Sequence, residues 1–246
     1  MKNIYIGTSG WSYKHWKNIF YPENVRPSGY LSFLAAEFNT TEINASFYRL
    51  PQPETIRQWI QSVATEFRFC PKMSRYLTQM KKLNDPEEPL ERFFTLFKPM
   101  KKYLGPVLIQ LPPNLGFHAG KTEYLFNVLK EKYGTFKIAL EPRHESWLGT
   151  PAINLLKRFQ ITWVIADSGG RFPMAEAVTA RDIYIRFHGP DGSYATSYTQ
   201  EALEGYAEKC IKWSSKGHHL WLFFNNDIHG YAIENARTIK KILHIE

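Results

Sequence analysis

The sequence has little cysteine and no long apolar run. Its two cysteines, Cys70 and Cys210, fall in a predicted strand and a predicted helix. This placement favours two buried thiols over a disulfide or a metal pair. No stretch approaches the ~20 apolar residues that a membrane-spanning helix needs. Gly7 interrupts the first apolar residues before they reach the length of a signal-peptide core. We therefore expect a cytoplasmic protein without a membrane partner.

What the sequence does contain is a repeated alternation of short apolar runs with stretches of helical period. The runs are rich in β-branched and aromatic residues and too short for helices, which is typical of strands. They span Ile4–Thr8, Thr41–Phe47, Phe67–Met73, Val107–Pro112, Lys137–His144, Thr162–Ser168, Ile183–Gly189 and His219–Asn226. Strands that alternate with helices pair in parallel through right-handed crossovers. Eight such units predict a single-domain (β/α)8 TIM barrel over residues 1–246, a fold that usually has ~250 residues.

Proline and glycine mark the ends of the helices between these runs. The predicted helices are Gly29–Phe38, Glu54–Thr65, Glu88–Leu104, Lys121–Lys132, one that begins at Thr150, Thr199–Ser215 and Tyr231–Leu243. Pro99 should kink or split the third of them. The sixth crossover, Gly169–Arg181, has little helical period, so we expect a degenerate or missing helix there.

Polar residues gather at the carboxyl ends of the predicted strands. Side chains alternate inward and outward along a strand, so residues of one parity near its end converge on the mouth where TIM barrels hold their active sites. The candidates are Glu42, Lys72, Glu141, Asp167 and His188 as catalytic groups, and Asn44, Gln110, Arg143, Arg186, Asn225 and Asn226 as substrate-binding groups. Polar groups destabilise a barrel core unless they are paired. We therefore favour a functional site over the alternative, a structural web of ion pairs.

The segment that follows the fifth strand, Glu141–Trp147, is dense in functional groups. Arg143 suits bidentate binding of a phosphate or carboxylate, and His144 emerges beside it. His188 is the better candidate for a general acid or base. The alternative is that His188 has a structural role and is hydrogen-bonded to the backbone. The aromatic candidates for stacking on a base or a sugar are Trp11, Tyr48 and Trp147.

The chain is basic, with a formal net charge of +8 and a pI near 9.3. This balance favours anionic partners. The segment Lys72–Leu83 contains four cations and no acid, so it is either a solvated loop or a rim that binds phosphate or carboxylate groups. The expected partner is a small anionic substrate or a nucleic acid, and the oligomeric state stays open.

The same mouth offers ligands to a divalent metal. The set consists of Glu42, Glu141, Asp167, Asp227 and His188, an oxygen-rich group with one imidazole as metal-assisted hydrolases use. No two of them recur at a diagnostic ligand spacing, and cations crowd the same mouth. A divalent cofactor is therefore the less favoured alternative.

Six motifs lie in order along the chain, most of them at predicted strand ends. They are Gly7–Tyr13 with Trp16, Glu42–Asn44 with Ser46–Arg49, Gly105–Pro106 with Gln110–Pro113, Glu141–His144 with Ser146 and Trp147, Arg186–Gly189, and Phe224–Asp227. They resemble the YecE-like family, also called domain of unknown function 72. The resemblance covers essentially the whole chain and implies a TIM barrel, but it supplies no reaction.

Three functions fit these features. In the first, an enzyme hydrolyses a phosphoester in a nucleotide or nucleic acid, with Arg143, Arg186 and Lys72 holding the anion. In the second, a metal-free lyase or isomerase uses His188, or uses Lys72 as a Schiff-base or proton-abstracting amine whose pKa the neighbouring arginines lower. In the third, a non-catalytic protein binds nucleic acid or another polyanion through Lys72–Lys82.

Overall fold

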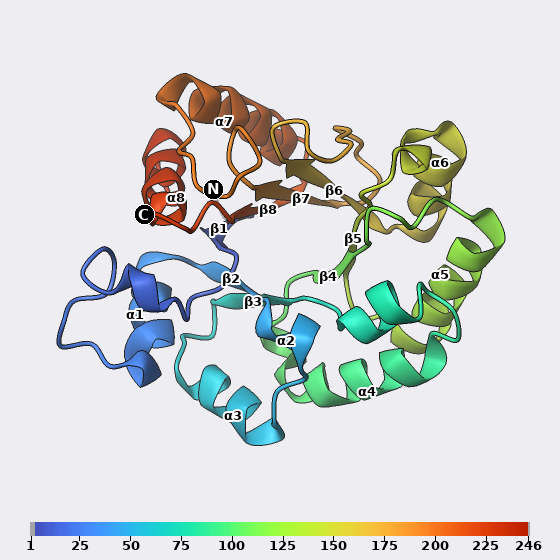
Figure 1. The fold of residues 1–246 in the computed structure, drawn as a ribbon, viewed down its shortest axis with the longest axis horizontal. Coiled ribbons are helices and arrows are strands. Elements are labelled where there is room, and N and C mark those ends of the chain that lie inside the picture. Colours follow the sequence, from blue (N-terminus) through green and yellow to red (C-terminus); the bar gives the residue numbers. More distant parts are fainter. Residues whose placement is uncertain (1–2, 246) are drawn as a thin grey trace.

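The computed structural model describes residues 3–245 and contains eight parallel strands that curve into a barrel, with helices on the outside (Figure 1). The strands are β1 (Ile4–Thr8), β2 (Thr40–Ile43), β3 (Arg68–Pro71), β4 (Val107–Gln110), β5 (Ile138–Glu141), β6 (Thr162–Asp167), β7 (Asp182–Phe187) and β8 (His219–Phe224). Their order in the sheet is β3-β2-β1-β8-β7-β6-β5-β4, and the paired strands run parallel. The predicted TIM barrel is confirmed.

The barrel is nearly closed, and its weakest seam lies between β3 and β4. There the Gly105 N–H donates to the Phe69 carbonyl at 2.9 Å and the Met73 N–H donates to the Leu108 carbonyl at 2.8 Å. Pro71 has no N–H to extend the ladder. At Gly105 an added Cβ would lie 2.6 Å from Cys70 Sγ, so only glycine allows the chain to approach this closely.

The helices cover the outside of the barrel (Figure 1). They are α1 (Tyr30–Glu37), α3 (Pro53–Gln61), α4 (Glu87–Phe97), α5 (Ala119–Tyr133), α6 (Thr150–Phe159), α7 (Gln200–Ser215) and α8 (Tyr231–Ile242). The short helix α2 (Ala45–Tyr48) lies at the mouth of the barrel instead. As predicted, the helix around Pro99 is split: α4 ends at Phe97 and a 3-10 segment, Lys98–Tyr103, contains non-helical Met100. The crossover Gly169–Arg181 holds no helix, also as predicted. The sequence analysis missed α2 and a π-helical turn, Tyr76–Met80.

The barrel interior is apolar at its lower and middle levels. The inward cluster consists of Cys70, Leu108, Ala139, Val164, Ala166, Tyr184, Trp221 and Phe223. At the amino-terminal end of the strands, Tyr5 stacks on Trp221 with ring centroids 4.1 Å apart. Both cysteines are free and buried, as the sequence predicts. No helix among residues 3–245 is long and apolar enough to cross a membrane. Buried Asp182, at the amino-terminal end of β7, accepts a hydrogen bond from Trp221 Nε1 at 2.7 Å. Most other polar side chains of the interior lie at the carboxyl-terminal mouth.

Candidate active site

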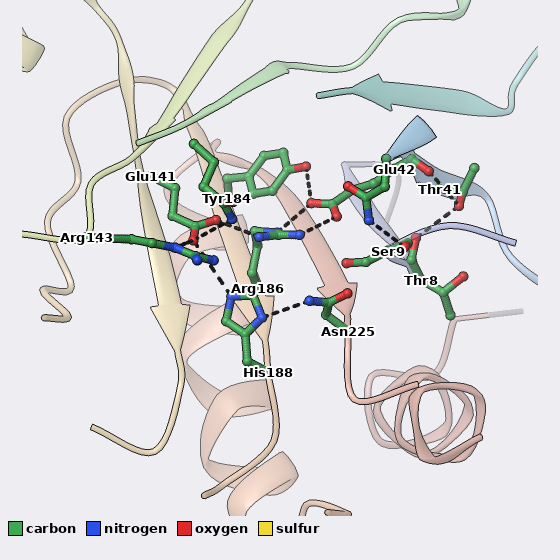
Figure 2. A network of polar contacts seen from close by, with 12 residues as sticks. Thr8, Ser9, Thr41, Glu42, Glu141, Arg143, Tyr184, Arg186, His188 and Asn225 are labelled. Carbon is green, nitrogen blue, oxygen red and sulfur yellow. Dashed lines mark hydrogen bonds and ion pairs between the residues drawn. The ribbon is translucent and has the colours of Figure 1, made fainter. Parts of the chain in front are cut away.

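A buried network of ion pairs lies across the mouth of the barrel (Figure 2). Arg186, at the end of β7, binds Glu42 of β2 with two nitrogens: Nε donates to Oε1 and one terminal nitrogen to Oε2, both at 2.8 Å. Its other terminal nitrogen donates to Glu141 Oε2 at 2.7 Å. The three side chains are at most 2% exposed. One guanidinium thus joins strands on opposite sides of the barrel.

Each carboxylate in this network accepts further hydrogen bonds. The Tyr184 hydroxyl donates to Glu42 Oε1 at 2.7 Å. Gln110, which β4 pairs with Glu141 of β5, donates its Nε2–H to Glu141 Oε1 at 2.9 Å. Burial opposes the charge of Glu141, but the guanidinium groups of Arg143 and Arg186 outweigh it and hold the pKa of this carboxyl well below its usual range. Glu141 is therefore a bound carboxylate rather than a free acid, and both oxygens of Glu42 accept hydrogen bonds from protein donors.

Arg143 is the second guanidinium of the site. Its Nε donates to Glu141 Oε1 at 2.8 Å, and its Cζ lies 4.1 Å from the centroid of the Phe172 ring. The side chain is 14% exposed, and its terminal nitrogens donate to no protein group within residues 3–245. Glu141 and Phe172 thus hold the fork in place and leave its two terminal nitrogens for a ligand.

His188 lies behind the network and is fully buried. Its Nδ1 is 3.0 Å from Asn225 Nδ2, while its Nε2 lies 3.9 Å from Glu141 Oε1. Burial, together with the charge of Arg186, lowers the pKa of His188 to about 3. The ring is therefore neutral at pH 7. Assigning the proton to Nε2 fits both neighbours, because Nδ1 then accepts from Asn225 and the N–H faces the carboxylate.

Lys72 directly follows β3, and its backbone is anchored on both sides. Its N–H donates to the Ile43 carbonyl at 3.1 Å, and the Ser46 hydroxyl donates to its carbonyl at 2.6 Å. The Nζ atom lies 4.1 Å from the centroid of the Phe47 ring, and no carboxylate in the described part of the chain forms an ion pair with it. Burial first, and the charge of Arg186 second, lower the pKa of Lys72 to about 7.

These groups open into a cavity of about 630 Å³ at the mouth. Its walls are formed by Gly10, Trp11, Ser12, Tyr13, Asn44, Ala45, Phe47, Tyr48, Lys72, Gln79, Gln110, Leu111, Pro112, Pro113, Arg143, Arg186, Tyr194 and Asn225. The volume is in the range of small-molecule sites. The lining residues include three cations and several aromatic rings but no aspartate or glutamate, so the cavity suits an anionic ligand.

Four residues predicted for the site lie elsewhere. On β6 the inward side chains are Val164 and Ala166, so Asp167 points outward and accepts a 2.7 Å hydrogen bond from the Tyr206 hydroxyl of α7. Asn226 is buried behind the mouth, where its Nδ2 donates to Asn235 Oδ1 at 2.8 Å. The structure corrects both placements.

The other two follow β5, where the chain leaves the sheet. His144 is exposed and caps a 3-10 turn, Glu145–Leu148, by accepting from the Ser146 N–H. Trp147 is buried, donates its Nε1–H to the Leu115 carbonyl at 3.0 Å and packs against Phe117. Beyond a strand end the local turn decides where side chains point, and the parity rule no longer applies.

The sequence analysis also missed residues that shape the site. Phe47 supports Lys72, Phe172 supports Arg143, and Tyr194 lines the cavity with Tyr13. Phe47 lies in the same family-like motif as Glu42, and this position was the feature of the sequence that could have placed it at the site. Phe172 lies in the crossover that lacks a helix, where no periodicity exists to place it.

The carboxylates proposed as metal ligands already have protein partners. Both oxygens of Glu42 and both of Glu141 accept from guanidinium, hydroxyl or amide donors. Within residues 3–245 no three histidine, cysteine or acidic side chains group as a metal site would require. A metal bound by these carboxylates would have to displace a guanidinium. A divalent cofactor therefore stays the less favoured alternative.

The fold and the site define a single-domain (β/α)8 barrel with a polar, cation-lined cavity at its carboxyl-terminal mouth. Residues 5–246 match the family described as "Protein of unknown function DUF72". The chain belongs to this family, as the resemblance of its motifs predicts.

Several members of the family are similar along most of their length. The UPF0759 protein YunF of Bacillus subtilis is 26% identical, and the match covers 99% of this chain and 95% of that protein. The UPF0759 protein YecE of Escherichia coli K12 is 28% identical, over 85% of this chain and 82% of that protein. The crystal structure of a DUF72 family protein from Thermotoga maritima superposes with a TM-score of 0.87 at 30% identity, covering 98% of this chain and 99% of that one.

Proposed function

We propose that this protein is an enzyme, a lyase or isomerase, in which the Lys72 amine attacks the carbonyl group of a small anionic compound. The observation that carries the proposal is the position of Nζ. It borders the cavity, rests on the Phe47 ring at 4.1 Å and has no carboxylate partner in residues 3–245. An amine whose pKa lies near 7 is neutral in about half of the molecules at pH 7. A neutral amine is the nucleophilic form.

The covalent step is the formation of an iminium ion. The lone pair of neutral Nζ bonds to the carbonyl carbon, and the carbonyl π electrons move to the oxygen. That oxygen takes up two protons, of which one comes from the amine and one from solution, and leaves as water. The iminium that remains carries one positive charge and withdraws electrons from the adjacent carbon, where a C–C bond can break or a proton can leave.

Arg143 supports the anionic part of the proposal. Arg143 lines the cavity, and its Nε is held by Glu141 and its plane by Phe172. A planar fork of this kind matches a carboxylate or phosphate in a bidentate pair. Two carboxylates, Glu42 and Glu141, face two guanidinium groups in the network, so a ligand anion would balance the charge that the iminium adds.

Phosphoester hydrolysis receives less support from the same contacts. Glu42 and Glu141 are engaged by guanidinium groups, and His188 Nε2 lies 3.9 Å from Glu141 rather than at the cavity wall. None of these three groups is available to activate a water molecule unless the ion pairs open. A non-catalytic polyanion binder has no need of a buried amine.

Borohydride trapping tests the proposal. The protein is incubated with pyruvate, 2-keto-D-gluconate or dihydroxyacetone phosphate, reduced with sodium borohydride and mapped by peptide mass spectrometry. We expect a reduced adduct on Lys72, no adduct in Lys72→Arg, and unchanged labelling in Asp167→Asn, whose carboxylate faces α7. Absence of an adduct with all three carbonyl compounds, or phosphoester turnover that survives Lys72→Arg, would overturn the proposal.

A further inference from the structure

We infer that the carbonyl substrate is hydroxylated, as a sugar phosphate or sugar acid is, and that Ser9 and Asn44 bind one of its hydroxyl groups. The inference rests on the proposed function and names the class of substrate for the same cavity. Its basis is a pair of buried oxygen atoms beside the cavity, Ser9 Oγ and Asn44 Oδ1, that have no hydrogen-bond partner in residues 3–245.

Ser9 directly follows β1 and is held by its backbone alone. Its N–H donates to the Phe224 carbonyl at 2.9 Å, and its carbonyl accepts from the Tyr13 hydroxyl and from Asn44 Nδ2, each at 2.7 Å. Its side chain is 1% exposed, yet Oγ has no hydrogen-bond partner. Figure 2 shows this side chain directed toward Arg186 and Asn225, which both line the cavity.

Asn44 presents its acceptor to the same region. Because its Nδ2 is bonded to the Ser9 carbonyl, the amide cannot turn freely, and Oδ1 is left buried and unpartnered. Asn44 lines the cavity. Buried polar atoms almost always have a hydrogen-bond partner in folded proteins. Two such atoms without one, on the lining residue Asn44 and on Ser9, whose carbonyl Asn44 contacts, therefore point to a bound group.

The chemistry of the two atoms selects a hydroxyl. An amide oxygen only accepts, whereas a serine hydroxyl both donates and accepts. A ligand hydroxyl can donate to Asn44 Oδ1 and accept from Ser9 Oγ–H. A carboxylate or phosphate oxygen would instead face the amide oxygen as a second acceptor. The anion therefore belongs at Arg143, and the hydroxyl belongs at Ser9 and Asn44.

The aromatic lining supports a sugar-like chain. Trp11 and Tyr13 lie on the loop that continues from Ser9, and both border the cavity. Trp11 is held edge-on by Trp59, with ring centroids 5.4 Å apart. Fixed rings of this kind offer an apolar face for the C–H side of a hydroxylated carbon chain while its hydroxyl groups bond elsewhere.

Matched probes that differ in a single hydroxyl test the inference. Dihydroxyacetone phosphate and hydroxyacetone phosphate carry the same charge and the same ketone. Trapping at Lys72 should reach half its maximum at a roughly tenfold lower concentration of the dihydroxy compound, as expected for a buried hydrogen-bonding site. Ser9→Ala should remove most of this difference without changing the value for hydroxyacetone phosphate. The thermal midpoint of the Ser9→Ala protein should not fall below that of wild type, because Ser9 Oγ has no hydrogen-bond partner in the described residues to lose.

Ser46→Ala is the matched control. The Ser46 hydroxyl donates to the Ile43 and Lys72 carbonyls, so its loss should lower the thermal midpoint and affect both probes equally. Equal half-maximal concentrations in wild type, or an equal effect of Ser9→Ala on both probes, would overturn the hydroxyl site and leave the amine chemistry standing. No adduct with either probe, and none with pyruvate or 2-keto-D-gluconate, would overturn the proposed function itself.

Discussion

Replacing Lys72 with methionine should raise the free energy of unfolding at neutral pH. Folding lowers the pKa of the amine from 10.5 to about 7, mainly because burial removes water from the ammonium group and secondarily because Arg186 repels it. One pKa unit corresponds to ~1.4 kcal/mol, so the fold opposes the charged amine by roughly 4–5 kcal/mol. Methionine has a similar length and no charge to desolvate.

The effect has a definite dependence on pH. Between about pH 7 and 10.5 the unfolded chain retains the Lys72 proton and the folded chain does not, so wild-type stability rises with pH in this window. The advantage of Lys72→Met should therefore be greatest at and below pH 7 and should shrink toward pH 10.5. The variant also loses the contact of the cation with Phe47, which is worth ~1 kcal/mol and reduces the gain. We therefore expect a net rise in the free energy of unfolding of roughly 2–4 kcal/mol at pH 7.

Urea unfolding of both proteins at several pH values from about 6 to 10 measures this difference. Lys212→Met, which removes an exposed lysine of α7, is the control and should show a small change that does not depend on pH. A Lys72→Met protein that is less stable than wild type at pH 7, or a difference that stays flat with pH, would refute the reasoning. The amine would then be hydrated in the folded state.

Two further predictions follow from the network. Glu141→Gln leaves the buried guanidinium of Arg186 with one of its two carboxylate partners. It should lower the free energy of unfolding, measured in urea, by about 3–5 kcal/mol. The control Glu66→Gln, at an exposed position, should have no measurable effect. Folding lowers the pKa of His188 from 6.5 to about 3, mainly through burial, so wild-type stability should fall as the pH drops through this window. His188→Gln should lack that component in acid titrations followed by circular dichroism.

The strands could be predicted from the sequence because each is a short apolar run between helical segments. The parity rule also brings together the members of the network, Glu42, Glu141 and Arg186, from the sequence alone. The rule works there because the inward side chains of barrel strands stack in layers, so inward residues near the strand ends lie at similar depth. Lys72 and Arg143 lie only one and two residues beyond a strand, and both reach the cavity.

The remaining predictions failed where local structure takes over from the sheet. On β6, parity had to be chosen from a run that is apolar on both faces, and the choice that put Asp167 inside was wrong. His144 and Trp147 belong to a 3-10 turn whose geometry depends on a histidine cap. Phe47 and Phe172 support Lys72 and Arg143 through contacts between distant or irregular segments, which no periodicity encodes.

The charge balance of the mouth argues against a purely structural web. Glu42 and Glu141 are matched by Arg143 and Arg186, and these four groups would stabilise the barrel mouth without any help. Lys72 adds a fifth ionisable group that this balance does not need. The lowering of its pKa to about 7 predicts that Lys72 weakens the fold at pH 7, and an apolar side chain in its place would fit the same aromatic support. An amine that lines a cavity, has no carboxylate partner in the described residues and has a lowered pKa fits the proposed chemistry on a ligand better than a role in packing.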